Sequence, residues 1–163
     1  MQRFPAMTAI AILCLAGACH RGRDEGRRMQ ATKEQEQAIG ALRDAYAAFN
    51  RGDIAAAVEA LDPQIEWIEP AEFPGGGTYH GQAGAKAYLT QSRASVADVH
   101  SEPERFIPAG DRIVVFVHAR VRAHDSDVWQ DVRLADVFTF RDGKAVQMRA
   151  FADRQEALRW AGM

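Results

Sequence analysis

The stretch RIVVFVHARVRAHDSDVWQDVRLADVFTFRDGKAVQMRAFAD, Arg112–Asp153, decides the fold. It holds three runs rich in β-branched and aromatic residues, and these runs are 112–124, 128–140 and 144–153. The turns between them are Asp125-Ser126 and Asp142-Gly143. An Asp-Gly pair between two such runs is a strong signal for a two-residue hairpin. The stretch therefore predicts an antiparallel meander, and a fourth strand over 101–107 is expected to precede it.

The two turns also predict which residues face each other, because a two-residue turn fixes the register of its strands. The predicted pairs are Arg120–Asp131, His118–Arg133 and Val114–Val137 from the first turn, and Val137–Met148 and Asp136–Arg149 from the second. One face then grades from apolar to charged side chains, which are Val114, Val137, Met148, Phe116, His118, Arg133, Arg120 and Asp131. The opposite face is also largely apolar. We therefore expect helices on one face and a second copy of the chain on the other.

The first half of the chain predicts helices. Ile39, Leu42, Tyr46 and Phe49 recur at three- and four-residue steps within a helix over 34–51. The other expected elements are a helix over 54–61, a strand over 64–69, a loop over 70–81, a helix over 83–98 and a helical turn over 155–161. Helices followed by an antiparallel sheet predict an α+β domain over residues 34–163.

The N-terminal segment differs from the rest of the chain. Arg3 precedes an apolar run over 6–15, and small residues then lead to Cys19. This order is typical of a secretory signal, and Ala-Gly-Ala-Cys resembles a bacterial lipobox. We expect residues 1–19 to be a lipoprotein-type signal peptide with Cys19 as the lipidated residue. Residues 20–33 are then expected to be a flexible tether that holds the domain at the cell envelope.

Two alternatives to the lipid anchor stay open. The chain can be exported without lipid after cleavage near Ala18, or it can be a cytoplasmic protein whose translation starts at Met29. Under each of them the folded domain has the same thiol content, because Cys14 and Cys19 are the only two cysteines of the sequence. The domain is therefore expected to have no disulfide, no cysteine nucleophile and no thiolate metal site.

Charge and histidine spacing argue against other classes of function. The formal net charge is −2 with both signs interspersed, which does not favour a nucleic-acid partner. The histidines that follow the tether lack the paired spacing of metal ligands, and they are His80, His100, His118 and His124. We expect neither a metal nor a cofactor.

Four segments together resemble the nuclear-transport-factor-2-like superfamily, in its ketosteroid-isomerase and SnoaL-like branch. They are AYAAFNRGDIAAAVEAL (Ala45–Leu61), IEWIEP (Ile65–Pro70), GTYHGQAG (Gly77–Gly84) and DVFTFRDGKAVQMRAFAD (Asp136–Asp153). The resemblance implies a cone-shaped barrel, in which a curved mixed or antiparallel sheet wraps three helices and encloses a pocket. Many members dimerise through the sheet. The family contains enzymes, binding proteins and structural modules, so the fold alone does not give the function.

The resemblance also implies roles for individual residues. In ketosteroid isomerase the catalytic carboxylate precedes a Pro at the end of the first strand, and Glu69 holds that position here. Arg133 stands at the position of the isomerase's sheet Asp and, with His118, is expected to stabilise an anion. Tyr46 lies one place from the isomerase's Tyr, so it is expected in the pocket wall. The full expected wall is Tyr46, Trp67, Tyr79, Phe116, Arg120, Trp129, Asp131, Val137 and Met148.

Three functions remain open from the sequence. The first is a pocket that binds a small, partly apolar molecule. The second is an isomerase- or cyclase-type enzyme in which Glu69 is the base and Arg133 and His118 stabilise the anion. The third is a non-catalytic, dimeric interaction module whose cone is filled by its own side chains, without a cavity of about 300 Å³ or more.

Overall fold

A computed structural model describes residues 16–163 and, for residues 16–24, their backbone alone. The elements in chain order are α1 (Ala16–Arg51), α2 (Ile54–Ala57), β1 (Leu61–Glu69), β2 (Gly77–His80), α3 (Gly81–Ala94), β3 (Asp98–Ala109), β4 (Arg112–Arg122), β5 (Trp129–Arg141), β6 (Lys144–Phe151) and α4 (Arg154–Trp160). The chain divides into two compact units, Met1–Glu34 and Gln35–Met163. The sheet and the site described below belong to the second unit.

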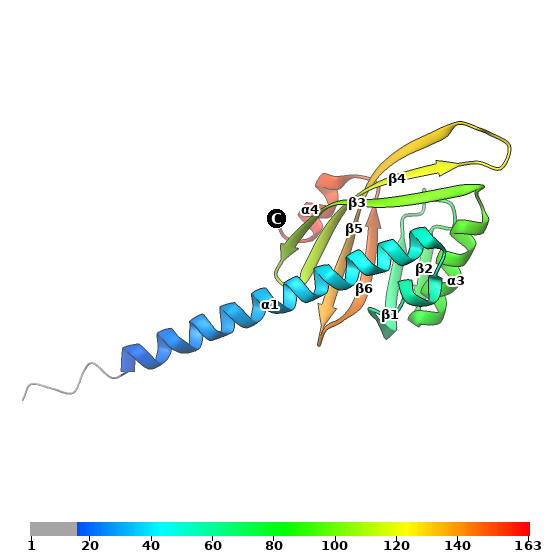
Figure 1. Cartoon of the computed structure of the whole chain (residues 1–163). Coiled ribbons are helices and arrows are strands. Elements are labelled where there is room, and N and C mark those ends of the chain that lie inside the picture. The colour runs from blue at the N-terminus through cyan, green and yellow to red at the C-terminus, as the bar shows by residue number, and fades with distance from the viewer. Residues whose placement is uncertain (1–15) are drawn as a thin grey trace, which may run out of the picture. The chain divides into compact units, whose positions relative to one another are not determined.

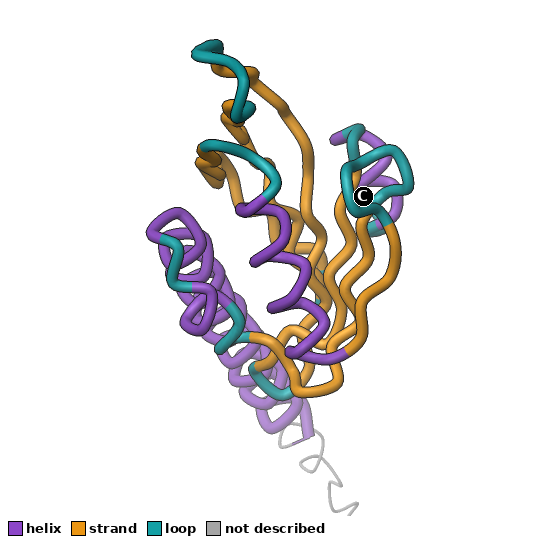
Figure 2. The backbone as a smooth tube through the Cα atoms, turned by 90° about the vertical axis from the view of Figure 1, so that its right-hand side faces the viewer, coloured by secondary structure: helices purple, strands orange, loops and turns teal. Residues whose placement is uncertain are grey.

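The six strands form one mixed sheet in the order β2-β1-β6-β5-β4-β3. Strands β1 and β6 run parallel, and the other neighbours run antiparallel. The predicted α+β class and curved sheet are confirmed, as Figures 1 and 2 show. The barrel is not closed, because β2 and β3 are the two ends of the described sheet. The described residues form four helices, and the fourth, α4, is the helical turn expected over 155–161.

The register between β4 and β5 is as the first turn predicts. Arg120 faces Asp131, and His118 faces Arg133. Asp125 and Ser126 lie in the connection between these two strands.

The predicted register between β5 and β6 is wrong by one residue. A bulge shifts the pairing between Thr139 and Phe140, so Val137 faces Arg149 and Asp136 faces Ala150. Since side chains alternate along a strand, a slip of one residue moves each of them to the other face. Met148 accordingly faces Phe138 and not Val137. Asp136 does not face Arg149, the partner that the sequence predicts for it.

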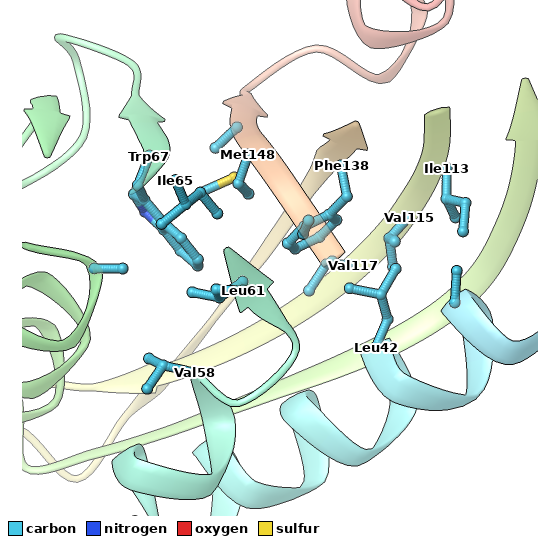
Figure 3. Close-up of a cluster of buried hydrophobic side chains, with 14 residues drawn as sticks. Leu42, Val58, Leu61, Ile65, Trp67, Ile113, Val115, Val117, Phe138 and Met148 are labelled. Carbon is cyan, nitrogen blue, oxygen red and sulfur yellow. The ribbon is translucent and has the colours of Figure 1, made fainter. Parts of the chain in front are cut away.

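The two faces of the sheet are covered differently. On one face, Leu42 of α1 lies beside Val115 and Val117 of β4, within the cluster shown in Figure 3. On the other face, α4 covers Val114, Ala135 and Val137 through Ala157 and Trp160, among others. Figure 2 shows α4 on the side of the sheet away from α3. A helix thus buries the apolar end of the face that was expected to need a second copy, and the sheet-to-sheet dimer stays a prediction.

Of the N-terminal predictions, the structure bears only on the tether. Residues 20–33, expected to be a flexible tether, are helical within α1. Their Arg, Gln, Glu, Lys and Ala residues have high helix propensity, which outweighs the glycines at 22 and 26. Residues 1–15 of the expected signal peptide and the side chain of Cys19 lie outside what is described. None of the described helices is long and apolar enough to cross a membrane.

Candidate functional site

A cavity of about 470 Å³ lies between the sheet and the helices α1 to α3. Its walls are mostly apolar, with Leu42, Phe49, Val117, Leu134 and Phe138 among the lining residues. Its volume is within the range of small-molecule sites. The interaction module that the sequence left open requires a cone filled by its own side chains, and this prediction is wrong because the cavity is present.

Glu69 is the last residue of β1 and points into this cavity. It alternates with the buried residues Ile65 and Trp67, and its side chain is only 7% exposed. The indole Nε1 of Trp67 donates a 2.7 Å hydrogen bond to Oε1 of Glu69. Burial and then the nearby charge of Asp136 raise the pKa of Glu69 from 4.5 to about 8, against the opposing effect of hydrogen bonds from Trp67 and Tyr88. Glu69 therefore carries a proton at neutral pH.

Asp136 is the second acid of the cavity. It lies on β5 between Leu134 and Phe138, which line the same cavity. The hydroxyl of Tyr46, from α1, donates a hydrogen bond to Oδ2 of Asp136. Burial raises the pKa of Asp136 from 3.8 to about 6, and this hydrogen bond opposes the rise. The pKa of Tyr46 is itself raised well above 10.0, first by burial and then by Asp136, so Tyr46 stays a donor.

Aromatic rings surround the two acids. The ring of Tyr88, from α3, has its centroid 6.1 Å from that of Trp67, and Phe138 meets Trp67 edge-on at 6.4 Å. Burial and then the charge of Glu69 raise the pKa of Tyr88, which keeps its hydroxyl neutral. Two carboxyl groups, two tyrosines and an indole thus share one largely apolar space.

The glycine-rich loop after β1 closes against the residue that follows Glu69. A Cβ on Gly76 would collide with the backbone carbonyl of Pro70 and would lie 2.8 Å from Cα of Ala71. Only glycine allows this approach. The hydroxyl of Tyr79 donates a 2.6 Å hydrogen bond to the carbonyl of Gly75. Tyr79 therefore braces the loop, and it does not line the cavity.

The structure brings together three of the expected site residues. Tyr46, Trp67 and Glu69 line the cavity. Met148 lies on the same side of the sheet, buried in the core cluster with 1% exposure, and it does not line the cavity. Phe116 and Val137 are on the opposite face, in the cluster that α4 covers.

The remaining expected residues lie on that opposite face, at its charged end. His118 and Asp131 share a 2.6 Å hydrogen bond, and Nε of Arg120 is 4.0 Å from the same carboxylate oxygen. The guanidinium of Arg120 lies 4.9 Å from the ring centroid of Trp129. Arg133 is exposed beside them. None of these residues lines the cavity.

The predicted combination of Glu69 with Arg133 and His118 is therefore not assembled. The reason is strand alternation: positions 133 and 136 are three residues apart on β5 and point to opposite faces. The acid that shares the cavity with Glu69 is Asp136, for which the sequence pattern predicted an arginine partner, Arg149. Only one feature of the sequence pointed to Asp136 as a site residue: it is an acid on the same strand face as the apolar residues Leu134 and Phe138. Tyr88 gave no sequence signal beyond an apolar position in its helix.

Comparisons with known proteins agree with this fold. Residues 42–148 match the model of a family described as the SnoaL-like domain. A search of curated proteins found no match. The crystal structure of TerC, co-crystallised with polyporic acid, is similar at 28% identity, with a TM-score of 0.65, over 78% of this chain and 99% of that chain.

Two bacterial structures are similar as well. An NTF2-like protein of unknown function from Burkholderia pseudomallei is 28% identical, with a TM-score of 0.66, over 78% of this chain and 98% of its own. An NTF2-like protein from Burkholderia thailandensis is 25% identical, with a TM-score of 0.64, over 77% of this chain and 97% of its own. In both cases the similarity covers almost the whole length of the other protein's chain.

Proposed function

The chain belongs to the SnoaL-like domain family, and we propose that it binds a small, largely apolar molecule in the cavity, with the polar part of that molecule held by Glu69, Asp136 and Tyr46. One observation carries this proposal. A cavity of about 470 Å³ has mostly apolar walls and a few converging polar groups. That combination is the usual form of a small-molecule site. TerC, a structural relative, was co-crystallised with a small molecule, polyporic acid, which supports the same class of function.

Filling the cavity tests the binding proposal. Ala119 lines the cavity from β4, and Ala119→Phe places a ring in the space that a ligand needs. The probe is N-phenyl-1-naphthylamine, an uncharged apolar fluorophore. We expect saturable 1:1 binding to the wild type and a loss of about tenfold or more in affinity for Ala119→Phe, since 1.4 kcal/mol of lost contact is tenfold.

The matched control is Arg133→Ala, on the opposite face of the sheet and exposed. Because Arg133 does not line the cavity, its removal should leave the affinity within about twofold. Binding that Ala119→Phe leaves unchanged, in a protein whose circular dichroism shows the native fold, would contradict the proposal.

A second candidate, proton transfer on the bound molecule, is supported by the pKa values of the two acids. With pKa values of about 8 for Glu69 and about 6 for Asp136, the first is mainly protonated and the second mainly ionised at pH 7. Two acids whose environments separate their pKa values in this way suit the roles of general acid and general base. Asp136 is then the base and Glu69 the acid, which reverses the role that the resemblance implies for Glu69.

Exchange of carbon-bound hydrogen tests the second candidate without knowledge of the substrate. A panel of cyclic ketones is incubated with the protein in D₂O, and deuterium uptake next to the carbonyl is followed by NMR. Positioned acid–base groups accelerate such steps by about 10²–10⁴. We expect Glu69→Gln and Asp136→Asn to lose this acceleration and Arg133→Ala to keep it. If no ketone takes up deuterium faster with the wild type than in buffer alone, the proton-transfer proposal is contradicted for this class of substrate.

For the N-terminus, we propose export and lipid attachment at Cys19. The support is the sequence itself: an apolar run is followed by small residues and a cysteine. Labelling of the bacterial host with a palmitate analogue should mark the wild type, and Cys19→Ser should abolish the label. A label that persists in Cys19→Ser would contradict lipid attachment at that residue.

A further inference from the structure

The cavity has an unusual balance of charge. Glu69 and Asp136 are its acidic residues, and no Lys, Arg or His is among the described residues that line it. The sequence led us to expect the reverse, an anion-binding site built on Arg133 and His118. In the structure the site offers two carboxyl groups and no basic side chain to a ligand.

The basic residues near the cavity are held by other partners. Nη1 of Arg93 donates a 2.9 Å hydrogen bond to the carbonyl of Phe49, and Arg93 is not among the residues that line the cavity. Arg154 pairs with Glu104 at 2.7 Å, and His118 pairs with Asp131 at 2.6 Å, both outside the lining. An anionic ligand would thus enter an apolar space that already holds two acids and has no countercharge.

We propose that the ligand of this cavity carries a protonated amine on an apolar body, and that its ammonium group pairs with Glu69 and Asp136 among the surrounding aromatic rings. This inference rests on the binding function proposed above and names the class of its ligand. An ammonium ion supplies the positive charge that the lining lacks, and its N–H groups are donors for the carboxylate oxygens.

The aromatic residues favour the same ligand class. Trp67, Tyr88 and Phe138 lie with neighbouring ring centroids 6.1 and 6.4 Å apart, and Trp67 also donates to Glu69. The faces of such rings attract cations, and Trp does so most strongly. Carboxylates and rings around one space are the combination that recognises alkylammonium groups.

A set of three probes that differ only in their polar group tests the inference. They are 2-naphthylmethylamine, 2-naphthalenemethanol and 2-naphthoate, which share one apolar body and are respectively cationic, neutral and anionic at pH 7. Their dissociation constants are measured by calorimetry with the whole chain. We expect the amine to bind at least about tenfold more tightly than the alcohol, as a cation beside a desolvated carboxylate gains roughly 1.4 kcal/mol or more. The naphthoate should bind more weakly than the alcohol.

Two variants connect the preference to the acids. Asp136→Asn and Glu69→Gln should each reduce the ratio of alcohol to amine dissociation constants toward one, with the affinity for the alcohol changed much less. Ala150 faces Asp136 across β5 and β6 and lines the cavity, so Ala150→Lys brings a cation to the site. The added ammonium group pairs with Asp136, so that variant should lose the preference for the amine over the alcohol.

The affinity for the amine should also rise from pH 6 to pH 8, because its ammonium group persists while Glu69 ionises. The groups that face Glu69 are Asp136 from β5, Tyr88 from α3, Tyr46 from α1 and Trp67 from its own strand. Of these, Asp136 titrates at the lower end of this interval and adds to the rise, and the two tyrosines stay neutral throughout it. The alcohol should show no comparable rise.

The outcomes separate the two proposals. A wild type that binds the alcohol or the naphthoate at least as tightly as the amine overturns the amine inference and leaves the binding function in place. If N-phenyl-1-naphthylamine binds but none of the three naphthyl probes does, the amine inference is likewise overturned and the binding function stays in place. If that fluorophore fails to bind as well, both proposals are overturned. A preference for the amine that survives in both acid variants also overturns the inference, since the preference would then come from another part of the molecule.

Discussion

Replacing Glu69 by Gln should stabilise the folded protein at neutral pH, although Glu69 lies in the proposed site. The pKa of Glu69 is about 8 in the folded state, against an ordinary value of 4.5. Between these two values the folded chain holds a proton that the unfolded chain releases. The free energy of unfolding therefore falls as pH rises, by about 1.4 kcal/mol per pH unit from this group.

The magnitude follows from the width of that interval. From pH 4.5 to pH 7, Glu69 alone lowers the free energy of unfolding by roughly 3 kcal/mol. Glutamine resembles the protonated acid in shape and still accepts the 2.7 Å hydrogen bond from Trp67. Glu69→Gln should therefore match the wild type near pH 4.5 and exceed it by about 3 kcal/mol at pH 7. The side chain is 7% exposed, so little of this effect is lost to screening by solvent.

Urea unfolding followed by circular dichroism between pH 4.5 and pH 8 measures the difference. The control is Glu36→Gln, which removes an exposed carboxylate on α1. Its curve should run parallel to that of the wild type. If the curve of Glu69→Gln also runs parallel to the wild type across this interval, Glu69 ionises freely in the folded state. The raised pKa, and the proton-transfer proposal that depends on it, would then be wrong.

Three further changes probe the support around the site. Gly76→Ala forces the loop away from the backbone it packs on, and we expect a loss of about 1–3 kcal/mol in urea unfolding, with Gly76→Ser at least as harmful. Tyr46→Phe removes the hydrogen bond to Asp136; the pKa of Asp136, followed by carbon-13 NMR, should rise above about 6. Arg154→Ala removes the 2.7 Å ion pair with Glu104. Because that pair lowers the pKa of Glu104, the pKa should rise toward 4.5 in the variant, as measured by carbon-13 NMR. An unchanged pKa would exclude the ion pair in solution.

The strongest sequence patterns predicted the fold correctly. The turn at Asp125 and Ser126 gave the register of β4 and β5 residue by residue. The alternation of β1 indicated that Trp67 and Glu69 share a face, and both do line the cavity. These inferences succeeded because the spacing of residues in a strand and its turn determines them locally.

Two features that shape the site could not be predicted from the local sequence. The bulge between β5 and β6 adds a residue near Val146, in a run with no glycine or proline to mark it. The position of α4 could not be inferred either, because the sequence predicted a helical turn there without saying which face of the sheet it would cover. Both features depend on the packing of distant segments.

The bulge decides the charge of the site. With the regular register that the turn at Asp142 and Gly143 predicts, Arg149 would face Asp136 inside the cavity. The shift instead places Ala150 opposite Asp136 and turns Arg149 to the other face, where its guanidinium lies 5.8 Å from the ring centroid of Trp160. One inserted residue thus leaves a cavity with two acids and no basic side chain in its described lining. The sequence alone predicted the opposite preference, for an anion held by Arg133 and His118, and neither of these residues lines the cavity.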